Sequence, residues 1–86
     1  MRRENSKMMS IYVIKNKVEN GYSPLEISPN DIVAKRRFKE ALSSDKVVYK
    51  DDFELYCLGD INPENMEITP KKPVLVATWA DLEHAE

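Results

Sequence analysis

Four basic side chains within five consecutive positions are the strongest chemical feature of this sequence. Lys35, Arg36, Arg37 and Lys39 surround a single aromatic residue, Phe38. Ammonium and guanidinium groups bind phosphate oxygens, and each such contact releases counterions from a nucleic acid. The run therefore predicts a nucleic-acid-binding site at these four residues. The solvated flank of an amphipathic helix gives the same pattern, and on spacing alone that alternative is the more common one.

Aromatic residues elsewhere in the chain offer stacking surfaces for unpaired bases near the basic run. These residues are Tyr12, Tyr22, Tyr49, Tyr56 and Trp79. Phe38 is interpreted differently, because it falls on the apolar side of the predicted helix and belongs to the core.

Groups suited to catalysis are sparse in this sequence. The only histidine, His84, lies close to the end of the chain, and Cys57 has no other histidine to act as its base. The two glycines form no phosphate-binding loop. The adjacent acids Asp51 and Asp52 are typical of solvated turn residues. We expect no enzyme, no catalytic residue, no metal site and no cofactor.

The composition fits one small soluble domain of 86 residues, with 42% hydrophobic and 33% charged residues. The only cysteine, Cys57, is expected to be a small core residue in a reducing compartment, and no apolar run is long enough for a membrane span. A cytoplasmic protein is predicted. We expect a disordered basic tail over residues 1–9, a domain over residues 10–80 and an acidic tail over residues 81–86.

The net charge of −2 conceals two halves of opposite charge. Residues 1–50 carry eleven Lys/Arg and six Asp/Glu, whereas residues 51–86 carry two Lys and nine Asp/Glu. This asymmetry predicts two functional surfaces, one of which contacts a polyanion. Self-association between oppositely charged faces is the alternative.

The sequence predicts several short strands and one helix. Strands are predicted at residues 10–15, 53–59, 66–69 and 74–79. The segment 25–27 is expected either at a sheet edge or outside the sheet, because it follows Pro24. Asn20-Gly21 predicts a tight turn. The strands at 53–59 and 66–69 form a hairpin with a six-residue loop, and the Pro-Lys-Lys-Pro run at residues 70–73 is expected to end the second of them.

The helix is predicted to begin at Ser28, which would cap it ahead of Pro29 and Asp31, and to run to about Ser43. Its apolar stripe comprises Ala34, Phe38, Ala41 and Leu42. Lys35, Arg36 and Lys39 share one flank of this stripe, while Arg37 lies near the other flank. The fold class is therefore α+β, a small antiparallel sheet with one amphipathic helix packed on it. Three strands are apolar on both sides and one helix covers one face, so a homodimer is expected.

Two segments of the chain resemble a known family. The segment Ala34-Lys35-Arg36-Arg37-Phe38 (A-x-R-x-F) precedes the strand Asp52-Phe53-Glu54-Leu55-Tyr56-Cys57-Leu58-Gly59-Asp60. Together they resemble the small nonstructural proteins of microviruses, in particular the gokushovirus branch, over roughly residues 11–70. Ile61 and Asn65 depart from the family pattern, which often has an aromatic residue and a glycine at these places.

The resemblance implies a phage protein that is made in the cytoplasm of the infected bacterium and is absent from the virion. It further implies a nonenzymatic accessory factor that binds DNA, with single strands as the expected partner, during viral single-stranded DNA synthesis and packaging. The alternative is a protein-interaction module that acts through its acidic half on the phage replication initiator or on a host replication factor.

Overall fold

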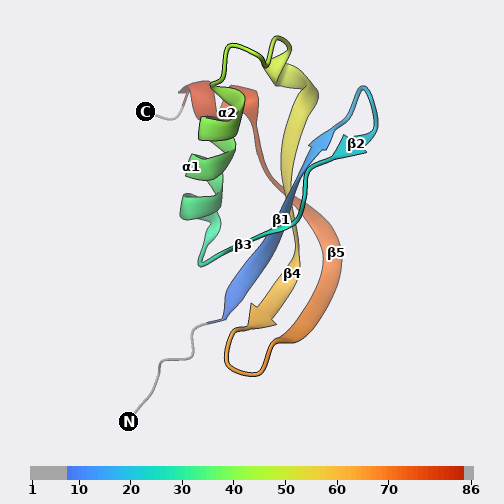
Figure 1. Ribbon diagram of the computed structural model, residues 1–86, viewed down its shortest axis with the longest axis vertical. Coiled ribbons are helices and arrows are strands. Elements are labelled where there is room, and N and C mark those ends of the chain that lie inside the picture. Colours follow the sequence, from blue (N-terminus) through green and yellow to red (C-terminus); the bar gives the residue numbers. More distant parts are fainter. Residues whose placement is uncertain (1–7, 85–86) are drawn as a thin grey trace.

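Antiparallel strands form the framework of the protein in the computed structural model, which describes residues 8–84 (Figure 1). The elements in chain order are β1 (Met9–Asn16), β2 (Gly21–Tyr22), β3 (Glu26–Ser28), α1 (Asp31–Leu42), the short 3-10 helix η2 (Lys50–Asp52), β4 (Phe53–Asn62), β5 (Glu67–Thr78) and α2 (Trp79–His84). The strand order is β2-β1-β4-β5, and β3 also pairs with β1. The predicted α+β class is confirmed.

The hydrophobic core lies between one face of the sheet and the two helices. Figure 1 shows α1 beside one end of the twisted sheet, while the β4–β5 hairpin extends past it. The buried residues of this core are Tyr12, Ala34, Phe38, Leu42, Leu55, Cys57, Ala77 and Leu82. Phe38 and Cys57 are thus core residues, as expected. Ala41 is exposed, so its place in the predicted apolar stripe was wrong.

The Pro-Lys-Lys-Pro run does not end a strand, which corrects the sequence prediction. β5 continues from Glu67 to Thr78 at the edge of the sheet, where proline loses no ladder hydrogen bond. Cys57 pairs with Val74 and Gly59 pairs with Pro70, so β5 carries extra residues opposite β4 and bulges there. The predicted strands at 66–69 and 74–79 are therefore one strand, and the hairpin loop is shorter than expected.

The turn between β1 and β2 forms where Asn20-Gly21 predicted it. Asn20 has a φ of 62°, a left-handed conformation that asparagine tolerates. The Asn16 side chain accepts hydrogen bonds from the backbone N–H groups of Val18 and Glu19. These hydrogen bonds give the N–H groups of the turn an acceptor within the turn itself. The turn places Lys15 directly opposite Tyr22.

The cap of α1 lies two residues beyond the predicted one. Asn30, in extended backbone conformation, accepts a hydrogen bond of 2.9 Å from the N–H of Val33. Ser28 is instead fully buried at the end of β3. Ser28 pairs with Ser10 of β1, so Asn30 is the first residue after β3 whose side chain can cap the helix.

Both ends of the chain differ from the expected tails where the structure describes them. β1 begins at Met9, one residue inside the predicted N-terminal tail. Residues 79–84 form α2, whose Leu82 packs into the core, so the acidic segment is largely helical. The remainder of both predicted tails, residues 1–7 and 85–86, lies outside the described residues.

Candidate nucleic-acid interface

Arg37 is separated from the other basic residues of α1 by its hydrogen bonds. Its guanidinium group donates to the backbone carbonyl of Ile27 at 3.2 Å and to the hydroxyl of Ser28 at 3.1 Å. These contacts hold α1 against the end of β3. The predicted position of Arg37 on the opposite flank agrees with this geometry, and its guanidinium group is committed to the fold.

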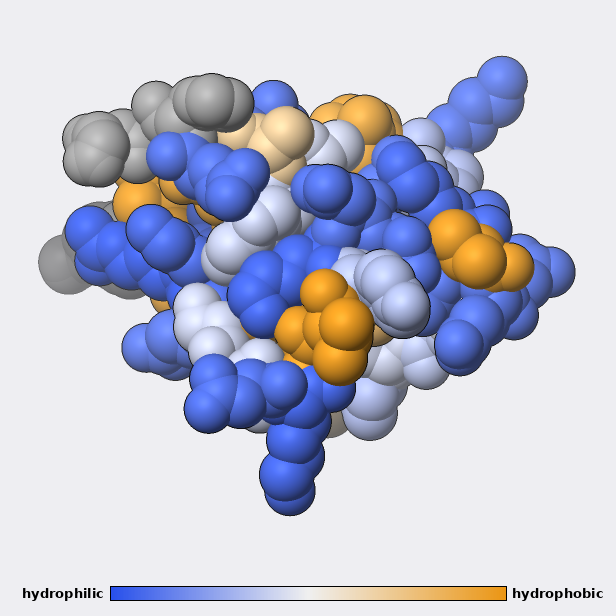
Figure 2. All heavy atoms as spheres, turned by 90° about the horizontal axis from the view of Figure 1, so that it is seen from above, coloured by the Kyte–Doolittle hydropathy of each residue, from blue (hydrophilic) through white to orange (hydrophobic). Residues whose placement is uncertain are grey.

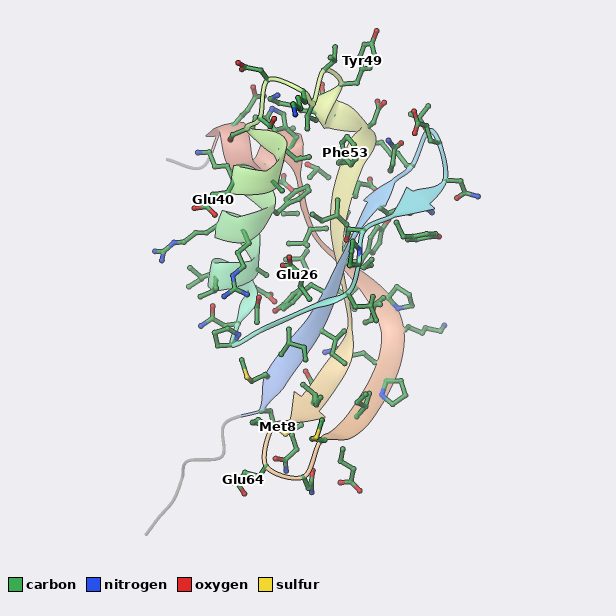
Figure 3. All side chains as sticks on the ribbon, in the orientation of Figure 1. Met8, Glu26, Glu40, Tyr49, Phe53 and Glu64 are labelled. Carbon is green, nitrogen blue, oxygen red and sulfur yellow. The ribbon has the colours of Figure 1, made fainter. Side chains whose placement is uncertain are left out.

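Arg36 and Lys39 form the accessible part of the basic run. Both side chains are exposed, three residues apart, and they line an open surface hollow together with Glu40 and Ser43. Lys35 is half-buried beside them. Figure 3 shows Glu40 on the side of α1 that points away from the sheet. The flank formed by Lys35, Arg36 and Lys39 is called the helix flank below.

The helix flank is held in place by the buried stripe behind it. Ala34 and Phe38 pack against the sheet, and Arg36 lies between them in sequence and faces outward. Residues four apart share one face of a helix and the residue midway between them lies on the opposite face, because the helix has 3.6 residues per turn. The geometry allows Arg36 and Lys39 to contact successive phosphates of one strand, and Glu40 contributes an opposing charge.

The aromatic residues do not gather around the helix flank as expected. Tyr12 is buried in the core, where its hydroxyl donates to Asp31. Trp79 is half-buried, with the Lys50 ammonium group 5.8 Å from its ring centroid. Tyr49 is exposed in the loop before η2, and Figure 3 shows it pointing away from the molecule at the loop end. Tyr12 is therefore closed to a base, and Trp79 is partly covered.

Tyr22 and Tyr56 lie on the sheet face opposite the core. Tyr56 pairs with Val13, and Tyr22 pairs with Lys15, two residues further along β1. Sequence reasoning named both tyrosines but missed Lys15 and Lys17, which accompany them. The signal was present, because the Asn20-Gly21 turn sets the register that pairs Lys15 with Tyr22.

Acidic residues border exposed apolar residues at the loop end of the molecule. Val48 and Tyr49 are each 73% exposed, and Lys50 separates them from Asp51 and Asp52. Figure 2, seen from above, shows separate hydrophobic patches in a mainly hydrophilic surface. These exposed apolar residues close the basic half of the chain and lie beside the first acids of the acidic half.

The described part of the chain shows neither a metal-binding cluster nor a membrane-spanning helix. Within residues 8–84, no group of three or more His, Cys, Asp or Glu side chains is arranged to hold a metal ion. In the same range, no helix combines the length and apolar character needed to cross a membrane.

The chain matches a known protein family. A family model described as "Phage ORF5 protein" matches residues 9–82. The matched range includes every strand and α1, together with the helix flank and both exposed tyrosines of the sheet. No curated protein and no solved structure matches the chain.

Proposed function

Because the chain belongs to the phage ORF5 protein family, we propose that it is a nonenzymatic DNA-binding protein of a microvirus of the gokushovirus branch. In this proposal it acts as a nonstructural accessory factor in viral single-stranded DNA synthesis and packaging, in the cytoplasm of the infected bacterium. It is absent from the virion.

One observation carries the DNA-binding part of the proposal. Arg36 and Lys39 are exposed on the outer flank of α1, where both side chains can reach phosphates while Ala34 and Phe38 remain in the core. The A-x-R-x-F segment thus combines packing residues with an outward cation. Arg37, predicted as a fourth contact, has a smaller role because it binds Ile27 and Ser28.

The experiment compares two variants that lose the same charge. Lys35→Gln/Arg36→Gln/Lys39→Gln removes the helix flank, and Lys46→Gln/Lys71→Gln/Lys72→Gln removes three lysines elsewhere. Each lost phosphate contact should flatten the log–log salt dependence of single-strand binding by about 0.7. We expect the first variant to bind DNA more weakly with a flatter slope, and the control to change much less.

Thermal melting of both variants checks that the fold is kept, since surface substitutions usually change stability by no more than about 0.5 kcal/mol each. A helix-flank variant that melts normally and binds DNA with the affinity and slope of the parent would refute the assignment of this flank.

A second function is favoured by the exposed Val48 and Tyr49 beside Asp51 and Asp52. In this alternative, the loop end binds a protein partner, the phage replication initiator or a host replication factor. Interfaces are enriched in exposed aromatic residues at their centre with charged residues at the rim. Tyr49→Ala would then abolish binding to that partner, and the helix-flank variant would bind it normally.

A further inference from the structure

The face of the sheet that points away from the core carries a group of residues without an assigned role. Residues directly opposite each other in antiparallel strands share a face. Lys15 lies opposite both Tyr22 and Glu54, and Tyr56 lies opposite Leu75. Their neighbours Ile14, Leu55 and Cys57 point into the core. We name the set Lys15, Tyr22, Glu54, Tyr56 and Leu75 the tyrosine face.

The tyrosine face is partly accessible to solvent. Tyr22 is 64% exposed and Leu75 is 47% exposed, while Tyr56 is half-buried. Val13, which pairs with Tyr56 on the same face, is buried. The Lys15 ammonium group lies 5.9 Å from the centroid of the Tyr22 ring, close enough for a cation–π contact.

The charges on this face favour an anionic ligand. Glu54 accepts a hydrogen bond of 2.8 Å from the Tyr56 hydroxyl, and its other oxygen lies 3.5 Å from the Lys17 ammonium group. The carboxylate is therefore compensated from two sides, and its side chain is only 16% exposed. Lys15 contributes a further positive charge beside Tyr22. The face thus carries two lysines and one carboxylate, and that carboxylate is already bound by Tyr56 and Lys17.

We infer that the tyrosine face binds single-stranded DNA by stacking an unpaired base on Tyr22 while Lys15 and Lys17 contact the adjacent phosphates. Aromatic side chains stack on any base, and neighbouring cations follow the backbone. A duplex offers no unpaired base to this face. The inference deepens the proposed function, since it assigns a second surface and a preference for single strands.

The tyrosine face and the helix flank lie on opposite sides of the sheet. A single strand reaches both only by passing around an edge of the sheet, and the protein extends 19 Å along its shortest axis. The two surfaces can therefore be tested separately, each by variants that leave the other unchanged.

A second copy of the chain is the competing occupant. A two-fold symmetric contact brings the same patch of both copies together. Lys15 and Lys17 of each copy would then meet at one interface, where like charges oppose association. The charge of this face therefore favours DNA over self-pairing.

Two exposed tyrosines provide a matched pair of variants. Tyr22→Ala removes the stacking ring, and Tyr49→Ala removes a ring that is 73% exposed in the loop before η2, outside the tyrosine face. Loss of one base–aromatic stack costs about 1–3 kcal/mol, which corresponds to roughly 5- to 150-fold in affinity. We expect this loss for Tyr22→Ala with oligothymidylate, near-parental affinity for Tyr22→Phe and Tyr49→Ala, and a smaller salt dependence for Lys15→Gln.

Each outcome of these titrations has a definite meaning. Parental affinity of a folded Tyr22→Ala protein overturns the tyrosine face. If only the helix-flank variant loses affinity for DNA, the proposed function stands and the tyrosine face has no part in it. Equal losses for oligothymidylate and a duplex overturn base stacking. If Tyr22→Ala changes the protein from a dimer to a monomer on sedimentation and leaves DNA binding unchanged, the face binds a second copy of the chain. Failure of the parent protein to bind either DNA overturns both proposals.

Discussion

The hydroxyl group of Tyr12 donates a hydrogen bond of 2.6 Å to the Asp31 carboxylate and so ties the middle of β1 to the first turn of α1. A hydrogen bond to a charged group contributes about 1.5–3 kcal/mol to stability. We expect Tyr12→Phe to lower the free energy of unfolding by this amount in chemical denaturation. Tyr56→Phe is the matched control, and its effect should be smaller because Tyr56 and Glu54 belong to the same strand.

The same tyrosine predicts a loss of stability in alkali. Burial raises the pKa of Tyr12 above its ordinary value of 10.0, and the hydrogen bond to Asp31 raises it further. Above pH 10 the unfolded chain therefore releases a proton that the folded chain retains, so stability is full below that pH and falls as the pH rises. Denaturation at about pH 9 and about pH 11 should show a steeper decline for the parent than for Tyr12→Phe. Equal declines would contradict this assignment.

The Pro-Lys-Lys-Pro segment shows where sequence reasoning about the fold reached its limit. Alternation, the Asn20-Gly21 turn and the helical stripe are local signals, and they placed β1, α1 and β4 correctly. Whether Pro70 and Pro73 end a strand depends on its place in the sheet, and β5 is an edge strand. The cap of α1 was missed for a similar reason, because Ser28 is held by its pairing in the sheet.

Phe38 lies at the centre of the core, and its truncation should destabilise the whole domain. Removal of a buried aromatic side chain costs about 3–5 kcal/mol, a large fraction of the stability of a small domain. We expect Phe38→Ala to melt at a much lower temperature or to be unfolded. Ile32→Ala on the same helix is the control, because Ile32 is 62% exposed. An unchanged melting curve for Phe38→Ala would place Phe38 outside the core.

The candidate site was only partly predictable for a physical reason. Helical periodicity correctly separated Arg37 from Lys35, Arg36 and Lys39, because position along a helix fixes the flank. The hydrogen bonds of Arg37 to Ile27 and Ser28 depend on tertiary packing. The tyrosines required strand register, which places Tyr22 and Tyr56 on the face opposite α1.

A homodimer stays a prediction, and the exposed edge of β5 is the surface on which we expect it. Val74 is 50% exposed on this strand, whose outer edge has no neighbour within the described residues. Such an edge is a template for pairing with another chain. Sedimentation at tens of micromolar should give a dimer mass that Val74→Lys reduces to a monomer. Ile32→Lys on α1 is the control, because Ile32 is 62% exposed and lies outside β5. A monomeric parent would rule the dimer out.

β4 and β5 approach each other closely at Gly59, which pairs with Pro70. Its φ is 154°, and a Cβ atom built there would lie 2.5 Å from the carbonyl oxygen of Thr69 and 2.9 Å from the Cα of Pro70. Both are backbone atoms, so the two strands would have to separate.

We therefore expect Gly59→Ala to cost at least about 2 kcal/mol, since backbone strain adds to the clash. Gly21→Ala is the matched control. Nothing lies within 4 Å of a Cβ atom at Gly21, so that change should be neutral or stabilise by up to about 1 kcal/mol. Denaturant titrations of both variants give the comparison. Equal stability of the two would mean that β5 can move away from Gly59 at little cost, and that the bulge opposite Leu58 is not fixed by this contact.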